Sequence, residues 1–199
     1  MAVLFRDVLR ASRRDDINYS DTTTRDWFRD KAQRSWFPMN PASVIRKRQA
    51  VPGLPPIGEM VMFHYDPKHK ATLPYYDSYP LIFPIQYYNN GFLGLNMHYL
   101  PPLFRARLMD ALYTRTNNKK FDETTKLRLS LQILTGASKF KYFQPTLHRY
   151  LTSHVRSNIV TIDSREWDYT LFLPLARFQK ASQQHVWNES VQKITGGSA

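Results

Sequence analysis

Short apolar runs of strand length occupy the middle of the chain. Residues 60–65 and residues 81–88 predict two strands, and Asn89-Asn90-Gly91 between the second and the next is typical of a tight hairpin turn. Residues 92–99 then predict the returning strand. Because proline has no backbone N–H to donate, we expect the second strand to lie at a sheet edge or to bulge at Pro84. This pattern predicts a small antiparallel sheet.

Apolar residues at helical spacing follow the predicted sheet. Pro101-Pro102 opens a first predicted helix, and Asp122 caps a second that ends at Gly136. Pro145 begins a third helix, and Ser182 caps the last one. The apolar stripe of the third helix is formed by Leu147, Tyr150, Leu151, His154 and Val155. We therefore expect the C-terminal half to be mainly helical.

One short strand interrupts this helical half, over residues 159–162. Asp163-Ser164-Arg165-Glu166 follows it with the spacing of a capping box. Together the elements predict the α+β class, with a small antiparallel sheet in residues 57–100 and helices in residues 101–199.

The first 56 residues differ from the rest of the chain. Apolar residues at helical spacing predict one short helix over residues 23–35, which Pro38 ends. Residues 51–56, Val-Pro-Gly-Leu-Pro-Pro, are too rich in proline for a helix or a central strand. This segment has too few apolar residues for its own core, so it must lie on the domain, dock on a partner or stay mobile. We therefore expect an extended arm over residues 1–56 and a compact α+β domain over residues 57–199.

Large aromatic side chains distinguish the arm. Burying one such ring contributes about 1.5–3 kcal/mol, whereas several rings left in water promote aggregation. Because the arm cannot bury its rings alone, we expect them to contact the domain or a neighbouring subunit. A basic triplet beside the proline-rich segment belongs to the same predicted surface. The predicted partner-binding residues of the arm are Trp27, Phe28, Trp36, Phe37, Arg46, Lys47 and Arg48.

The composition narrows the classes of partner. The net charge is +12 at pH 7, which indicates an acidic partner such as nucleic acid, an anionic membrane surface or an acidic protein. The basic residues are spread along the chain, so they do not mark a dedicated DNA-binding tail. The chain has no cysteine, which excludes disulfides, thiolate metal sites and cysteine nucleophiles. We expect neither a secretory signal nor a transmembrane helix, because no apolar run is long enough.

Candidate catalytic and metal-binding residues are few. His64 and His69 flank a loop that contains Asp66, and His98 follows on a nearby predicted strand. A three-histidine metal site is one interpretation, and ordinary core or surface histidines are the other. The sequence has no Gly-x-Ser-x-Gly elbow, no phosphate-binding loop and no dinucleotide fingerprint. We therefore expect no catalytic residue, no metal, no cofactor and no small-molecule substrate.

Cations alternate with aromatic rings in Lys139-Phe140-Lys141-Tyr142-Phe143, as they do on surfaces that bind single-stranded nucleic acid. The same alternation is also typical of a half-buried strand or loop whose lysine side chains point to solvent. Tyr75-Tyr76-Asp77-Ser78-Tyr79-Pro80 leaves these alternatives open too, and rigid aromatics also suit permanent protein interfaces. The candidate nucleic-acid-binding residues are Lys139, Lys141, Tyr142 and Phe143.

Distinctive motifs lie along most of residues 25–190. They are Trp27-Phe28-Arg29, Phe63-His64-Tyr65-Asp66-Pro67-Lys68, Leu73-Pro74-Tyr75-Tyr76-Asp77, Pro80-Leu81, the run from Gly91 to Pro101, the run from Tyr150 to Ser157, Phe172-Leu173-Pro174-Leu175 and Val186-Trp187. This set resembles a family of virion-associated proteins encoded by contractile-tailed bacteriophages, the myoviruses. Some members of that family carry a label for protecting packaged DNA ends. The resemblance implies no catalytic residue.

The resemblance and the aromatic arm lead to competing hypotheses. The first is a structural component of a tailed-phage virion, in the tail, baseplate or neck, whose arm binds neighbouring subunits in a symmetric assembly. The second is a DNA-end-binding protein that protects packaged phage DNA, which the net charge of +12 favours. A third, a hydrolase or nuclease, requires that the fold bring His64, Asp66 and His98 together. The first two imply a virion location after assembly in the host cytoplasm, virion proteins as partners and no membrane.

Overall fold

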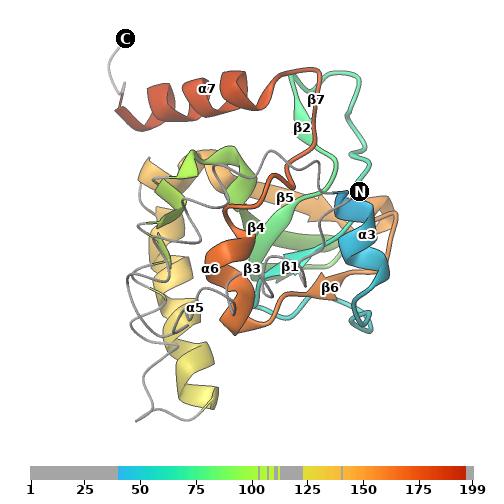
Figure 1. The fold of residues 1–199 in the computed structure, drawn as a ribbon, viewed down its shortest axis with the longest axis vertical. Helices are drawn as coiled ribbons and strands as arrows, with labels where there is room; N and C mark the ends of the chain where they lie inside the picture. Colours follow the sequence, from blue (N-terminus) through green and yellow to red (C-terminus); the bar gives the residue numbers. More distant parts are fainter. Residues whose placement is uncertain are drawn as a thin grey trace, which may run out of the picture.

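The computed structural model describes residues 40–102, 104–106, 108–109, 112, 123–139 and 141–195. A five-stranded antiparallel sheet forms the centre of this part, in the order β5-β4-β3-β1-β6 (Figure 1). A separate antiparallel pair joins β2 to β7. The strands are β1 (Val61–Met62), β2 (Tyr76–Asp77), β3 (Leu81–Tyr88), β4 (Gly91–Asn96), β5 (Leu147–Leu151), β6 (Val160–Thr161) and β7 (Phe178–Gln179).

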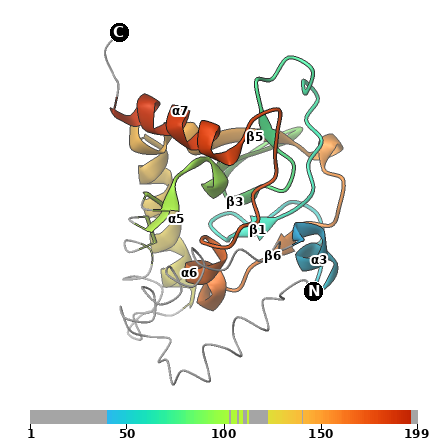
Figure 2. The ribbon, with the colours of Figure 1, turned by 45° about the horizontal axis from the view of Figure 1, so that its top comes forward.

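Helices pack around this sheet. The described part of the chain includes the α-helices α3 (Pro41–Arg46), α5 (Glu123–Lys139), α6 (Trp167–Thr170) and α7 (Gln183–Thr195), and its residues between 102 and 112 are also helical. Short 3₁₀ turns are η1 (Met97–Tyr99), η2 (Lys141–Thr146), η3 (Thr152–His154) and η4 (Ser164–Glu166). In Figures 1 and 2, α3 lies beside β6, α5 stands at the other side of the sheet, and α7 crosses one end. The predicted α+β class is confirmed.

The strand alternation divides the core between the two faces of the sheet. Met60 and Met62 face a cluster that includes α3, α5, α6 and the helical residues before α5. Val61 and Phe63 face the opposite side, which is rich in aromatic rings. Successive side chains of a strand point to opposite faces, so one short sequence supplies both cores. None of the helices that the structure describes is both long and apolar enough to span a membrane.

The predicted hairpin is confirmed, and Gly91 shows why its sequence is constrained. β3 and β4 pair through Tyr88 and Gly91 on either side of the two-residue turn. A Cβ on Gly91 would approach the backbone oxygen of Tyr150 to 1.9 Å, so only glycine permits β5 to pair here. The bulge expected at Pro84 is present, since the register shifts between Pro84 and Gln86. The alternative of an edge strand is wrong, because β3 lies between β1 and β4.

Two predicted helices differ from the structure. The helix expected to begin at Pro145 is instead the end of η2 followed by β5, because residues 147–151 pair with β4 from Gly91 to Leu95. Pairing with an existing strand outweighs the helical spacing of the apolar residues. Gly136 does not end α5, which continues to Lys139 and buries Ala137 in the core. The predicted strand at 159–162 and the cap of the last helix are confirmed, the latter by a 3.2 Å bond from His185 N to Ser182 Oγ.

The described part of the predicted arm lies on the domain. Val44 and Ile45 of α3 are each 6% exposed and join the core beside the sheet. Val51 N donates to Ile159 O over 2.8 Å. The predicted helix over residues 23–35 and the anchors Trp27, Phe28, Trp36 and Phe37 lie outside the described residues. The division of the chain at residue 56 stays a prediction.

Candidate functional site

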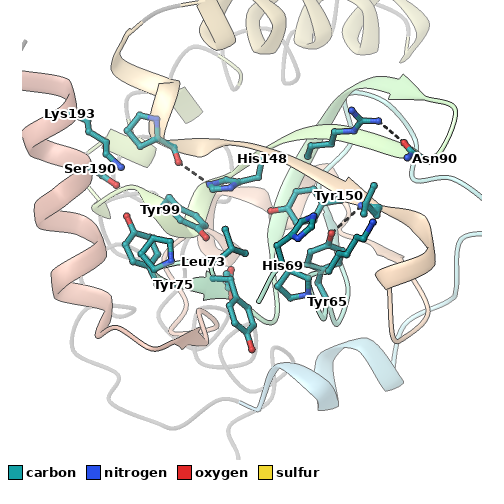
Figure 3. Close-up of a pocket in the computed structure, with 18 residues that line it drawn as sticks. Tyr65, His69, Leu73, Tyr75, Asn90, Tyr99, His148, Tyr150, Ser190 and Lys193 are labelled. Carbon is teal, nitrogen blue, oxygen red and sulfur yellow. Dashed lines mark hydrogen bonds between the residues drawn. The ribbon is translucent and has the colours of Figure 1, made fainter. Parts of the chain in front are cut away.

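A cavity of about 620 Å³ lies between the loop before β2, strand β5 and helix α7. Its walls are mainly aromatic: in Figure 3, Tyr75 and Tyr99 lie on one side, Tyr65 and Tyr150 on the other, and His148 between them. Basic side chains complete the lining. The aromatic and basic lining residues are Tyr65, Tyr75, Tyr76, Tyr99, Tyr150, His69, His148, Lys68, Arg149 and Lys193. We call this cavity the tyrosine pocket.

The aromatic face of the sheet fixes the back of the tyrosine pocket. Tyr65 and Tyr150 are 7% and 4% exposed, with ring centroids 5.0 Å apart. Leu151 N donates to the Tyr65 hydroxyl over 3.1 Å, and Asn96 Nδ2 donates to the Tyr150 hydroxyl over 3.1 Å. Phe92 stacks on Tyr150 at a centroid distance of 5.6 Å. Each tyrosine is held by both packing and a hydrogen bond, so this wall is rigid.

Tyr99 and His148 form the wall between the sheet and α7. Their ring centroids lie 4.0 Å apart. The Nε2 atom of His148 lies 3.1 Å from Pro145 O, and because a carbonyl oxygen only accepts, Nε2 carries the proton. Burial lowers the pKa of His148 to about 4. His148 is therefore neutral near pH 7, and its Nδ1 is an unprotonated acceptor.

Tyr75 connects the loop before β2 to α7. Its hydroxyl donates to Glu189 Oε2 over 2.8 Å, and its ring centroid lies 6.0 Å from that of Tyr99. Burial, together with the adjacent Glu189 carboxylate, raises the pKa of Tyr75, so the hydroxyl stays protonated. Tyr75 is only half-buried, unlike Tyr65 and Tyr150, so part of its ring is accessible.

A buried pair, Asp77 and His98, anchors β2 against the sheet. His98 Nδ1 lies 2.6 Å from Asp77 Oδ2, and the two side chains are 0% and 1% exposed. Asp77 Oδ1 accepts from Tyr79 N and Arg177 N over 3.0 and 3.2 Å. Burial opposes ionisation of Asp77, but His98 and these backbone donors outweigh it and lower its pKa. Burial also lowers the pKa of His98, so a neutral ring donates from Nδ1 to a covered carboxylate.

The backbone carbonyl of His98 anchors α7. Trp187 Nε1 donates to it over 2.9 Å, and Arg105 Nη2 over 3.2 Å. Arg105 is 3% exposed, and its other donors reach Leu100 O over 2.6 Å and Leu171 O over 2.5 Å. Burial lowers the pKa of Arg105 to about 9, which still leaves it charged at neutral pH. His98 thus holds β2 through its ring and α7 through its carbonyl, and both elements border the tyrosine pocket.

The basic lining residues are at the solvent side of the pocket. Lys68 and Arg149 are exposed, and the Lys193 side chain is 62% exposed. The guanidinium of Arg149 lies 4.4 Å from the ring centroid of Tyr88, which orients it by a cation–π contact. Lys193 Nζ lies 3.8 Å from Glu189 Oε2, so part of its charge is balanced. The mouth of the pocket still carries more positive than negative side chains, which suits an anionic ligand.

A second cavity, of about 640 Å³, adjoins the tyrosine pocket and shares Tyr65 and Tyr76 with it. Its charged lining residues are Asp66, Lys70 and Arg156. Lys70 Nζ lies 2.9 Å from Asp66 Oδ1, and Arg156 Nη2 lies 3.9 Å from Asp66 Oδ2. The two cations outnumber the carboxylate, so the positive field continues past the tyrosine wall.

Of the predicted nucleic-acid-binding residues whose side chains the structure describes, Lys139 and Phe143, neither lines the tyrosine pocket. Lys139 is exposed at the end of α5, and Phe143 is half-buried against the core, so its ring is not an open stacking surface. Pro145, later in the same η2 turn, does line the pocket. The side chains of Lys141 and Tyr142 lie outside the described part of the chain. Nucleic-acid binding by this stretch stays a prediction.

The basic triplet of the arm lies away from the tyrosine pocket lining. Arg46 and Lys47 are exposed at the end of α3. Arg48 Nη2 lies 2.5 Å from Glu166 Oε2 of the same chain. This ion pair helps to fix the described part of the arm on the domain, and partner binding by the triplet stays a prediction.

The fold does not assemble the alternative histidine site. His98 is buried against Asp77, whereas the ring of His64 stacks on Tyr79 at a centroid distance of 4.9 Å. His69 is exposed at the tyrosine pocket. Within the described ranges, no group of three or more histidine, aspartate or glutamate side chains is placed to hold a metal ion. The hydrolase hypothesis therefore receives no support from these residues.

Most of the tyrosine pocket was missed by the sequence interpretation, because its residues come from distant segments. The sequence marked Tyr75 and Tyr76 as part of a possible binding stretch, but it gave Tyr99, His148 and Lys193 no place in one. The spacing of His148 and Tyr150 was a usable signal, because residues two apart in a strand lie on the same face and both of these line the pocket. Predicting a helix there removed that signal.

The comparisons with known proteins identify one family. A family model described as "Phage T4 terminal DNA protecting protein" matches residues 1–194 of the chain. No curated protein and no solved structure matches the chain significantly.

Proposed function

Because the chain belongs to the phage T4 terminal DNA protecting protein family, we propose that it binds the ends of linear phage DNA and shields them. The observation that carries this proposal is the family match, which spans residues 1–194. The description of that family concerns DNA termini and mentions no tail or baseplate. It therefore favours the second sequence hypothesis over the first, a structural role in the tail, baseplate or neck.

The charge of the protein supports the same proposal. A net charge of +12 attracts phosphates and supplies affinity that does not depend on base sequence. The tyrosine pocket adds rings beside exposed cations, a combination that suits nucleic-acid strands. Duplex interior and duplex end present similar phosphates, so recognition of an end requires a feature such as this pocket in addition to charge.

The proposal includes a non-catalytic mode of action. Protection would arise because the bound protein occupies the terminus and excludes other proteins from it. It also includes the virion as the location after assembly in the host cytoplasm, with other virion proteins as further partners. The bacteriophage family supports this setting.

A protection assay tests the proposal. The full chain is incubated with a blunt linear duplex, and the DNA is then challenged with an exonuclease that needs a free end. We expect digestion to be delayed at protein concentrations that leave endonuclease cleavage of a closed circle of the same sequence unchanged. Equal inhibition of both nucleases would show general coating of DNA and would refute end protection.

Competition measures the end preference directly. A labelled linear duplex bound by the protein is competed with unlabelled linear DNA or with a dumbbell whose ends are closed by loops. The linear competitor should be more effective at equal mass. Both affinities should fall with salt, with a log–log slope of about −0.9 for each phosphate contacted.

A further inference from the structure

We infer that the tyrosine pocket holds the terminal nucleotide of one DNA strand in an unpaired form, with its base against the half-buried rings and its phosphate near the exposed cations. This inference rests on the proposed function and deepens it, since it names the part of the DNA end that is recognised. It also distinguishes the pocket from the rest of the basic surface, which binds phosphates of any DNA.

The size of the tyrosine pocket favours a single nucleotide. Its volume of about 620 Å³ lies within the range of about 300–1,000 Å³ that is typical of pockets for small ligands. A duplex end presents two paired bases with a backbone on each side, which is too large for such a cavity. An extruded nucleotide in a fitted pocket is the form in which many proteins reach a single base.

The rings divide into a fixed wall and an accessible group. Tyr65 and Tyr150 are buried and held by hydrogen bonds, so they close the back of the pocket. Tyr75, Tyr76 and His148 are half-buried and offer partly accessible ring surface. Every base has a flat π-face, so stacking on such rings tolerates any base. This suits a protein that must recognise an end irrespective of its sequence.

The charges select a nucleotide over an uncharged aromatic ligand. Lys68, Arg149 and Lys193 line the pocket and are exposed, so a phosphate can reach them from solvent. Asp77 also lines the pocket, but its side chain is 1% exposed and bound to His98. It therefore does not oppose a phosphate as an exposed carboxylate would.

Unpairing determines which DNA ends should bind best. A terminal base pair must open before its nucleotide can enter the pocket, whereas an overhanging nucleotide is already unpaired. We therefore expect a one-nucleotide overhang to bind about tenfold more tightly than a blunt end closed by a G·C pair. An overhang that carries an abasic sugar should bind like the blunt end, because it keeps the phosphate and loses the stacking base.

Fluorescence anisotropy with hairpin DNA tests these expectations. Each hairpin has one loop-closed end and one free end, which is blunt, extended by one thymidine on the 3′ or the 5′ strand, or extended by one abasic residue. A double-looped dumbbell of the same stem is the closed control. The full chain is used throughout, at one salt concentration.

Variants connect the effect to the pocket. Tyr75→Ala should reduce the overhang advantage several-fold, while Tyr75→Phe, which keeps the ring, should preserve it. Tyr87→Ala is the matched control, since Tyr87 is 42% exposed and lines neither cavity. The abasic comparison uses the unmodified protein, so it decides the question even if Tyr75→Ala fails to fold.

The outcomes separate this inference from the proposed function. Equal binding of the thymidine and abasic overhangs overturns the inference, and the proposed function stands if the hairpins still bind more tightly than the dumbbell. Equal binding of hairpins and dumbbell refutes both. Thymidine monophosphate that displaces the overhang hairpin at concentrations near the Kd of the hairpin would instead assign the pocket to free nucleotides and overturn the inference.

Discussion

Replacing Asp77 by alanine should be among the most destabilising substitutions in the described part of the chain. The Asp77 carboxylate is buried and accepts from His98 Nδ1 over 2.6 Å and from Asn96 Nδ2 over 3.3 Å. It also accepts the backbone N–H groups of Tyr79 and Arg177. Removing it leaves the Nδ1–H of His98 without a partner at a position that water does not reach, because the His98 side chain is 0% exposed.

The size of the effect follows from these partners. An unsatisfied buried donor costs about 1–3 kcal/mol, and the lost carboxylate had accepted from two buried side-chain donors, His98 Nδ1 and Asn96 Nδ2. The backbone donors of Tyr79 and Arg177 are part-buried and can recover some of their loss from water. We therefore expect the free energy of unfolding to fall by about 2–4 kcal/mol. With a urea m-value of about 2 kcal/mol/M, the midpoint should fall by about 1–2 M.

Urea titrations followed by circular dichroism measure this change. Asp66→Ala is the matched control, because the Asp66 side chain is 33% exposed and its Lys70 partner is 54% exposed. The control should leave the midpoint almost unchanged, since exposed ion pairs are screened by solvent. Asp77→Asn keeps the shape and an acceptor oxygen, so it should lie between the two. Equal midpoints for Asp77→Ala and Asp66→Ala would refute the stabilising role of the buried pair.

Further predictions concern protonation, charge and backbone space. Burial lowers the pKa of folded His148 to about 4, below the value of about 6.5 that a histidine has in an unfolded chain, so stability falls as the pH drops from 6.5 toward 4. His148→Gln should reduce this loss, which is about 3 kcal/mol, in urea midpoints measured at pH 7 and pH 4.5. Arg149→Gln should weaken DNA binding and reduce the slope of log affinity against log salt concentration by about 1 in anisotropy titrations. Arg46 lies outside the pocket lining, so Arg46→Gln should leave the preference for DNA ends unchanged. Gly91→Ala should destabilise the protein by about 1–3 kcal/mol or more, because its Cβ would meet Tyr150 O at 1.9 Å. Gly136→Ala has nothing within 4 Å of the added Cβ, so it should stabilise α5 by about 0.5–1 kcal/mol. Thermal melts of the two variants compare these effects.

Local patterns predicted the sheet better than the helices around it. The hairpin of β3 and β4 follows from residues that are close in sequence, a turn of Asn-Asn-Gly between two apolar runs. The strand β5 depends on a partner more than fifty residues away, Gly91 to Leu95 of β4, so its own spacing was misleading. Gly136 weakens a helix but does not end it when Ala137 beyond it is buried.

The candidate site was harder to predict because contacts distant in sequence create it. The sequence left the role of Tyr76 and Asp77 open, whereas in the fold they form β2, which pairs with β7 about a hundred residues later. For His98 the sequence left open a metal ligand or an ordinary core or surface histidine, and the structure supports a core residue, which is buried and hydrogen-bonded to Asp77. Only the folded topology reveals that these segments border one cavity.

The buried polar groups beside the tyrosine pocket explain how the fold keeps that pocket in shape. His98 binds Asp77 of β2 through its ring and Trp187 of α7 through its carbonyl, so one residue fixes two separate walls. Arg105 bonds to the same carbonyl and links it to the backbone at Leu171. Apolar packing alone would hold these elements together but would permit sliding, whereas directional hydrogen bonds fix their register. These directional bonds therefore favour one arrangement of β2 and α7, and a preorganised pocket loses less entropy when it binds.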